Sequence, residues 1–268
     1  MNGTMQVQLY GRVIIEGEIR ALSGLHIGRG KESISVGGID NAIIREPISG
    51  NPYIPGSSLK GKLRSLAEKA TPTAMQNQPV GRDVFMHTCD APDCPVCRIF
   101  GAPAEMAGDA PTRLVVRDIP LTPDSLIKLK ASEAGSNLTE IKYEASIDRV
   151  TAKANPRPLE RVPAESVFGP FQMVFSVYKP ADAKLLKKLT HYMELLEEDY
   201  LGGSGSRGSG KIQFEKLKIW IKPVSQHGSI KGQKADLEVE NIGALLDKLD
   251  ELVATVEKKI LVPQPAQP

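Results

Sequence analysis

Long hydrophobic runs and a strong charge of one sign are both missing from this sequence of 268 residues. No stretch of eighteen apolar residues occurs, and the first residues lack the basic and apolar segments of a secretion signal. We therefore expect a cytoplasmic protein without a membrane partner. The formal net charge of +2 excludes a protein that binds nucleic acid through the field of the whole molecule. Any nucleic-acid site must be a local stripe of cations.

Cysteine is also scarce, and its three copies lie in one short segment beside a histidine. Three thiols cannot pair completely, and nothing else suggests secretion, so a disulfide framework is disfavoured. Four soft ligands at this spacing suit tetrahedral Zn²⁺, and a closed site of this kind predicts a structural metal. The candidate ligands are His87, Cys89, Cys94 and Cys97. Two alternatives remain: reduced cysteines beside a bystander histidine, or a nearby acid, Asp90 or Asp93, in place of His87.

The rest of the composition is that of a globular protein, with 41% hydrophobic and 25% charged residues. Apolar residues alternate in strand-like order over residues 6–22, and strands are also expected at 114–119, 168–177 and 212–221. Helical periodicity covers 181–200 and 237–259. Periodicity fades over 71–110, and the polar segment 137–167 is typical of a projecting hairpin. This order predicts an α+β core of ferredoxin type with long insertions.

Residues 54–64 predict the start of a helix. Pro55 and Gly56 end the preceding strand, and Ser57 or Ser58 can cap the new helix. The leucines that mark its buried side, at i, i+4 and i+7, are Leu59, Leu63 and Leu66.

Three cations follow the same helix start, where free backbone amides and the helix dipole attract anions. They are Lys60, Lys62 and Arg64, with Lys60 and Arg64 one turn apart. The segment is typical of a place where a phosphate backbone lies on a protein. The alternative is an ordinary solvated helix face.

A glycine-rich segment over residues 202–210, with Arg207 inside it and Lys211 next to it, presents many unobstructed backbone amides. Such a loop can approach a phosphodiester closely. Its spacing matches neither the P-loop nor the dinucleotide fingerprint, so nucleoside triphosphate binding is disfavoured. Beside the basic helix it would form the second wall of a groove. The alternative is a flexible connector.

Two single residues are candidates for chemistry. Asp40 follows two glycines and an isoleucine, and its carboxylate could hold a divalent cation at an RNA phosphate while the 2′-hydroxyl attacks in line. The more common role of such an aspartate is to close a turn. His26 could transfer a proton or contact a phosphate, or it could be a packed turn residue.

Five collinear motifs combine these features: residues 24–28, 38–40, 54–64, 147–157 and 199–211. Together they resemble the crRNA-binding backbone subunits of type III-A CRISPR effectors, which are RAMP-superfamily Csm proteins of the Cas-seven type. The resemblance extends from about Val13 to Leu217. The cysteine-containing insertion departs from many members of that family.

This resemblance implies a single RAMP domain over residues 1–262, with an RRM-like, ferredoxin-type palm and a β-hairpin thumb. The thumb would lie at about residues 137–168, and the zinc-held insertion at about 71–112. Residues 263–268 would form a disordered tail. Copies of such a subunit stack into a filament along the crRNA beside other Csm effector subunits.

The resemblance also implies an activity, because Asp40 falls on the family's catalytic aspartate. That residue cleaves complementary single-stranded target RNA at regular intervals in an endoribonuclease reaction that depends on Mg²⁺ or Mn²⁺. The residues expected to hold the guide RNA are His26, Ser57, Lys60, Lys62, Arg64, Gly203, Ser204, Gly205, Ser206 and Arg207. Two alternatives are a structural guide-binding subunit without cleavage and a guide-processing endonuclease of the same superfamily.

Overall fold

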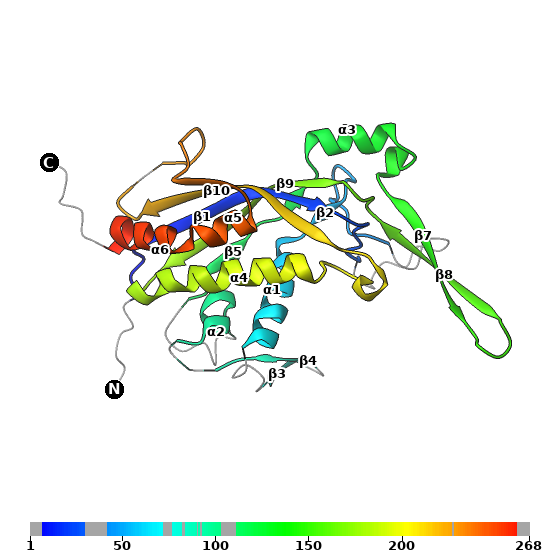
Figure 1. The fold of residues 1–268 in the computed structure, drawn as a ribbon, viewed down its shortest axis with the longest axis horizontal. Coiled ribbons are helices and arrows are strands. Elements are labelled where there is room, and N and C mark those ends of the chain that lie inside the picture. Colours follow the sequence, from blue (N-terminus) through cyan, green and yellow to red (C-terminus); the bar gives the residue numbers. More distant parts are fainter. Residues whose placement is uncertain are drawn as a thin grey trace.

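The computed structural model describes residues 7–29, 42–71, 77–81, 84–89, 91, 93–102, 111–226 and 228–261. Its centre is a five-stranded antiparallel sheet in the order β11-β10-β1-β9-β5 (Figure 1). The strands are β1 (Gly11–Ala21), β5 (Leu114–Val116), β9 (Val167–Val177), β10 (Ile212–Pro223) and β11 (Leu237–Asn241). Alternate residues of β1 are buried, as its polar and apolar alternation predicts.

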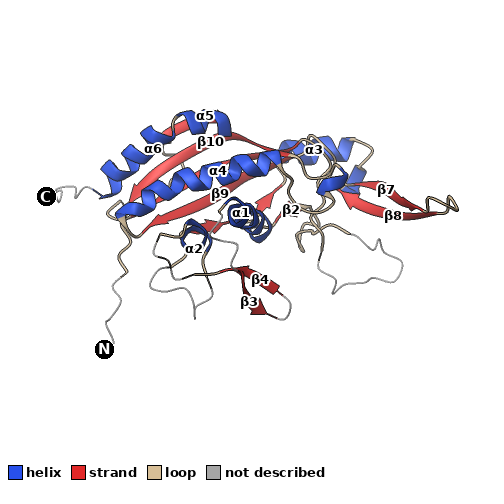
Figure 2. Cartoon of the chain, turned by 60° about the horizontal axis from the view of Figure 1, so that its bottom comes forward, coloured by secondary structure: helices blue, strands red, loops and turns tan. Residues whose placement is uncertain are grey.

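Helices form a second layer over one face of this sheet (Figures 1 and 2). They are α1 (Gly56–Ala70), α4 (Leu185–Glu198), α5 (Ile242–Asp247) and α6 (Leu249–Val256). Leu59, Leu63 and Leu66 of α1 belong to one core cluster with α4 and the sheet, which confirms the predicted apolar stripe. The short helices η3 (Pro180–Lys184) and η5 (Glu257–Leu261) precede α4 and follow α6. No helix in the described part of the chain is long and apolar enough to cross a membrane.

The C-terminal part corrects one sequence prediction, because residues 237–259 do not form a single helix. Leu237 and Val239 alternate with acidic residues and extend the sheet, with Val239 opposite Leu217 of β10. The helix begins only after Asn241, whose side chain accepts a hydrogen bond of 2.9 Å from the N–H of Ala244. This N-cap separates a strand from a helix within one apolar-rich segment.

The start of α1 corrects a second prediction, because neither Ser57 nor Ser58 caps the helix. The N-cap residue is Pro55, and the N–H of Gly56 donates a hydrogen bond of 2.7 Å to Oδ1 of Asp118. A carboxylate from a distant segment therefore satisfies a free amide at the positive end of the helix dipole.

Two hairpins extend from the core. Strands β7 (Glu140–Ile147) and β8 (Ala154–Arg161) pair in register and project from one end of the sheet, as the sequence predicts (Figure 1). On the helical side, β3 (Asn77–Gly81) and β4 (Val84–His87) pair next to α2 (Pro95–Phe100) (Figure 2). The remaining elements are β2 (Tyr53–Ile54), β6 (Ile119–Pro120), α3 (Pro123–Ala131), η2 (Gly135–Asn137) and η4 (Gly205–Arg207). The sequence prediction did not include α3.

Candidate functional site

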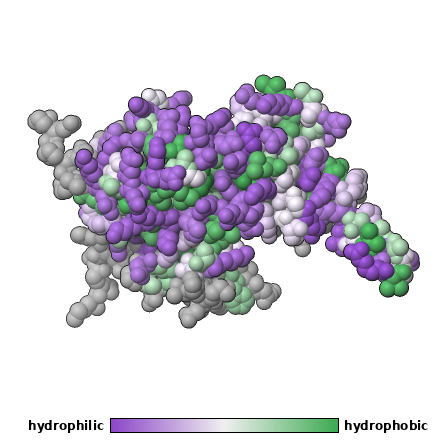
Figure 3. Space-filling model, in the orientation of Figure 1, coloured by the Kyte–Doolittle hydropathy of each residue, from purple (hydrophilic) through white to green (hydrophobic). Residues whose placement is uncertain are grey.

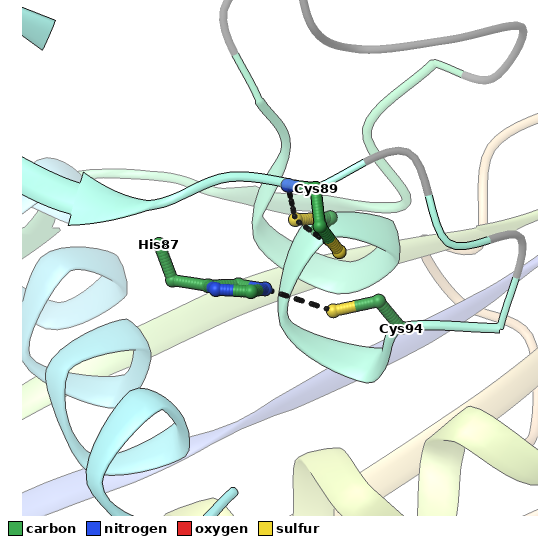
Figure 4. Close-up of side chains that lie close together, drawn as sticks. His87, Cys89 and Cys94 are labelled. Atoms are coloured by element: carbon green, nitrogen blue, oxygen red, sulfur yellow. Dashed lines mark hydrogen bonds between the residues drawn. The ribbon is translucent and has the colours of Figure 1, made fainter. Parts of the chain in front are cut away.

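The four predicted metal ligands come together in the insertion. One ligand atom from each of His87, Cys89, Cys94 and Cys97 lies within 4.8 Å of the other three. His87 ends β4, and Cys94 is the N-cap of α2 (Figure 4). Cys97 lies in the first turn of that helix. A nitrogen and three sulfurs in this arrangement could hold a metal ion.

Contacts inside this cluster fit such a role. Nε2 of His87 lies 3.3 Å from Sγ of Cys94, and Sγ of Cys89 lies 3.8 Å from Sγ of Cys97. His87 is 2% exposed, and its Nδ1 has no hydrogen-bond partner among the described residues. The hydrogen bond between Cys94 and Cys97 is the largest cause that lowers the pKa of the Cys94 thiol and raises the pKa of the Cys97 thiol, so it favours one thiolate in this pair.

The two acidic alternatives to His87 find no support in the described residues. Asp93 is exposed and does not belong to the group of four. Asp90 lies outside the residues that the structure describes. Among the described residues, His87 therefore stays the candidate for the fourth ligand.

The cations of α1 do not form one stripe. Nζ of Lys60 donates a hydrogen bond of 2.9 Å to the carbonyl oxygen of Leu114 in β5. Burial, followed by repulsion from Arg64, lowers the pKa of this lysine. Lys62 is two residues further along α1. Because each residue of a helix is rotated by about 100° from the one before it, Lys62 lies on a different side of the helix. Successive cations therefore contact different parts of the protein.

Lys62 connects α1 to the start of the glycine loop, which is residues 201–210. Its Nζ lies 2.9 Å from Oδ2 of Asp199 and 3.6 Å from the centre of the Tyr200 ring. A Cβ added at Gly205 would lie 2.0 Å from that ring, so the loop packs directly on Tyr200. The two predicted walls of the groove are therefore adjacent at Lys62.

The glycine loop is not a flexible connector, because backbone hydrogen bonds attach it to the segment after β1. The N–H of Gly203 donates to the carbonyl oxygen of His26 at 2.8 Å, and the N–H of Gly210 donates to that of Gly24 at 3.0 Å. At Gly202, φ is +79° and an added Cβ would lie 2.2 Å from the His26 oxygen. Glycine is needed there for both conformation and space.

The same loop also contacts the projecting hairpin. Nε of Arg207 pairs with the carboxylate of Glu144, and Nζ of Lys142 donates to the carbonyl oxygen of Arg207 at 2.7 Å. Nη2 of Arg207 donates to Oγ of Ser204 at 2.9 Å. The Arg207 side chain is nevertheless 60% exposed. The loop therefore connects the segment after β1 to the hairpin. Arg207 is an accessible cation where the loop and the hairpin meet.

The two candidates for chemistry differ in their position. His26 is 9% exposed, and its Nδ1 lies 2.6 Å from the carbonyl oxygen of Glu160, which supports the packed alternative for its ring. Asp40 lies outside the described residues. The flanks of its segment pair with each other, because Gly28 and Ile43 form an antiparallel bridge and the N–H of Ile44 donates to the oxygen of Ile27 at 2.8 Å.

Sequence reasoning missed the part that Glu160 plays at this junction. Its carboxylate is 11% exposed and accepts hydrogen bonds from the N–H of Ile43 at 2.9 Å, from Arg45 at 2.6 Å and from Oγ1 of Thr139 at 2.9 Å. Glu160 belongs to the hairpin strand β8, whereas Ile43 and Arg45 lie just after the Asp40 segment. No local signal could have identified these partners, because they are distant in the sequence.

Comparisons with known proteins agree on one family. The model of the RAMP superfamily matches residues 18–213. A protein from Methanocaldococcus jannaschii named CRISPR system Cms endoribonuclease Csm3 is 41% identical over 91% of this chain and 95% of its own length. A protein of the same name from Methanothermobacter thermautotrophicus is 39% identical over 85% of this chain and 94% of its own length.

A solved structure gives the same result in three dimensions. The chain is similar to one in a crystal structure of the Csm3-Csm4 subcomplex in the type III-A CRISPR-Cas interference complex. The TM-score is 0.60 at 34% identity, and the match covers 91% of this chain and 98% of that one. Sequence and fold therefore agree over nearly the whole length of both proteins.

Proposed function

Because this chain belongs to the RAMP superfamily, and within it to the Csm3 proteins, we propose that it is the crRNA-binding backbone subunit of a type III-A CRISPR effector complex. In this role it is an endoribonuclease that cleaves target RNA complementary to the guide. The observation that carries this proposal is the 41% identity to a Csm3 endoribonuclease over 95% of that protein. The partners are the crRNA, the single-stranded target RNA, further copies of the chain and other Csm subunits.

The topology supports an RRM-like palm. Omitting the additions, the element order is β1, α1, β5, β9, α4, β10, which is the β-α-β-β-α-β order of ferredoxin-like folds. The hairpin of β7 and β8 corresponds to the thumb. Its large exposed apolar residues include Tyr143, Ile147 and Val150, and Figure 3 shows apolar surface at the far end of the hairpin. Such a surface suits contact with RNA bases or a neighbouring copy.

The insertion is proposed to be held by a structural Zn²⁺. His87, Cys89, Cys94 and Cys97 would supply all four ligands, which leaves no open position for a substrate. The metal would contribute folding free energy to a segment whose sequence has too little apolar content to fold alone. We expect about one zinc ion per chain by elemental analysis.

The guide RNA is proposed to lie along the glycine loop at the thumb junction. Arg207 supplies an exposed cation, residues 204–206 supply backbone amides and hydroxyls next to Gly203, and Ser57 is exposed at the start of α1. Lys62 is beside the loop, and the buried residue His26 accepts a backbone hydrogen bond from Gly203 of the loop. Lys60 contacts β5 on another side of α1, so it would reach the RNA only outside this loop. Contacts of this kind position the backbone, whereas base pairing with the guide selects the target. Arg64 has internal partners, in α1 and in the insertion.

Asp40 is proposed as the catalytic residue. A bound Mg²⁺ or Mn²⁺ would stabilise charge on the scissile phosphate, and the carboxylate of Asp40 would hold that ion. Gly28 and Ile43 pair with each other on the two sides of the segment that contains Asp40. This pairing supports the proposal, because it holds both ends of that segment close to the thumb and the glycine loop.

The test is Asp40→Ala in the reconstituted guide complex with labelled complementary RNA. We expect target binding to persist while the evenly spaced cleavage products disappear, as they also would in wild-type complex with a chelator. Unchanged cleavage by the variant would reject the catalytic assignment. Target binding without cleavage by the wild-type complex would favour the structural alternative, and cleavage of the guide precursor by the isolated chain would favour the processing alternative.

A further inference from the structure

Arg64 reaches from α1 into the insertion that contains the His/Cys cluster. Its Nη2 donates a hydrogen bond of 2.7 Å to the carbonyl oxygen of His87, and its Nη1 donates one of 3.0 Å to that of Gly101. Nε lies 2.8 Å from Oε1 of Glu68, one turn along the helix. All three guanidinium nitrogens therefore have acceptors inside the protein, and the side chain is only 14% exposed.

Two of these acceptors, the carbonyl oxygens of His87 and Gly101, belong to the two arms of the cluster, which are the end of β4 and the helix α2. His87 is itself one of the four proposed ligands. Gly101 follows α2, and its N–H donates a hydrogen bond of 3.0 Å to the carbonyl oxygen of Cys97, another of the ligands. One planar group thus connects the end of β4 to the end of the helix that contains Cys97.

Glu68 completes the arrangement on the β4 side. Its Oε1 accepts a hydrogen bond of 3.3 Å from the N–H of His87 while it pairs with Arg64. The backbone N–H and C=O of His87 are therefore both held by the Arg64–Glu68 pair. Such contacts fix the position of the residue without occupying its imidazole.

We propose that Arg64 is a positioning residue for the His/Cys cluster. Its guanidinium holds the His87 arm and the Cys97 arm at ligand distance from each other. This inference rests on the proposed zinc site and replaces the RNA-binding role that the sequence predicts for Arg64. A guanidinium fork is suited to two separate carbonyl acceptors and a carboxylate, whereas a lysine ammonium is a single point charge on a flexible stem.

The experiment measures zinc release from the full-length chain to a chelating indicator dye. Arg64→Met and Arg64→Lys are compared with wild type and with Lys69→Met, a matched control that removes one exposed cation from the same helix. Loss of a contact outside the ligand set typically weakens metal binding by about 10–100-fold. We expect both Arg64 variants to bind zinc more weakly than wild type by a factor of this order, and therefore to release it more readily. Lys69→Met should release zinc as wild type does.

A second variant and a second measurement separate the possible outcomes. Glu68→Gln keeps the helix but weakens the charged pair, and we expect faster zinc release than from wild type. We expect crRNA retention by Arg64→Met to match that of Lys69→Met, because each loses one positive charge. Zinc release from the Arg64 variants at the Lys69→Met rate would overturn this inference alone. A wild-type chain without zinc would overturn the proposed metal site and this inference together. A specific loss of crRNA by Arg64→Met with normal zinc retention would restore the RNA-binding role.

Discussion

Glu160 of the hairpin and Arg45, which lies before β2, form an ion pair in which Oε1 of Glu160 lies 2.6 Å from Nη2 of Arg45. The glutamate side chain is 11% exposed, and its other oxygen accepts a hydrogen bond from the N–H of Ile43. The backbone oxygen of the same residue contacts His26. One residue therefore joins the hairpin to both segments that flank residues 30–41.

Replacing Glu160 tests this junction. Glu160→Ala removes a nearly buried acceptor and leaves the N–H of Ile43 without its partner, so we expect a loss of about 1.5–3 kcal/mol in the free energy of unfolding. Urea denaturation would measure it. Glu165→Ala is the control, because Glu165 is 69% exposed in its contact with Arg20 and should contribute little. Equal losses in the two variants would contradict the role of Glu160.

The pH dependence of this contribution follows from the pKa of Glu160. Burial opposes ionisation, but the hydrogen bonds from Ile43, Arg45 and Thr139 outweigh it and lower the pKa below its ordinary value of 4.5. Because the folded pKa is the lower one, the stabilisation is fully present above about pH 4.5 and is lost as the pH falls through the folded pKa. The difference in unfolding free energy between wild type and Glu160→Gln should therefore narrow on acidification.

The sequence predicted the parts of the fold that depend on local periodicity. The stripe of Leu59, Leu63 and Leu66 identified α1, and alternation identified β1. The division at Asn241 was missed because two short elements shared one apolar-rich segment. The spacing also predicted that His87, Cys89, Cys94 and Cys97 come together, since four residues within one short segment require little long-range information.

The partners of charged residues could not be predicted in the same way. Lys60, Lys62 and Arg64 read as one basic row, but each has a different acceptor, in β5, at the end of α4 and in the insertion. Charge is encoded locally, whereas the acceptor is set by packing between segments far apart in sequence. For the same reason, the sequence did not predict the hydrogen-bond partners of Asp118 and Glu160.

Asp118 should be the residue that stabilises the start of α1. Asp118→Ala removes the acceptor of the Gly56 N–H, and loss of a cap of this kind costs about 1 kcal/mol. Thermal or urea unfolding would measure the change. Ser57→Ala is the control, because the Ser57 side chain is exposed and makes no cap. A larger loss for Ser57→Ala than for Asp118→Ala would contradict this assignment.

Gly202 should be a sensitive position of the glycine loop. Gly202→Ala combines a left-handed φ of +79° with a Cβ 2.2 Å from the oxygen of His26. Gly208→Ala is the matched control, because its φ is +85° but nothing lies within 4 Å of the added atom. A left-handed alanine alone costs about 1–2 kcal/mol. We expect Gly202→Ala to lose more stability than that, and similar losses would show that the loop can move away from His26.

Arg207 provides a test of the RNA surface that is separate from stability. Its side chain is 60% exposed and pairs with Glu144, so Arg207→Met should change the unfolding free energy by less than about 1 kcal/mol. If the guanidinium contacts a phosphate, the same variant should weaken crRNA binding and reduce the slope of log affinity against log salt by about 1. Glu144→Gln leaves the cation in place but weakens its competing internal partner, so it should bind crRNA at least as tightly as wild type. Filter binding at several salt concentrations would measure both variants. An unchanged salt slope in Arg207→Met would remove Arg207 from the guide-binding surface, and weaker binding by Glu144→Gln would mean that the ion pair itself shapes that surface.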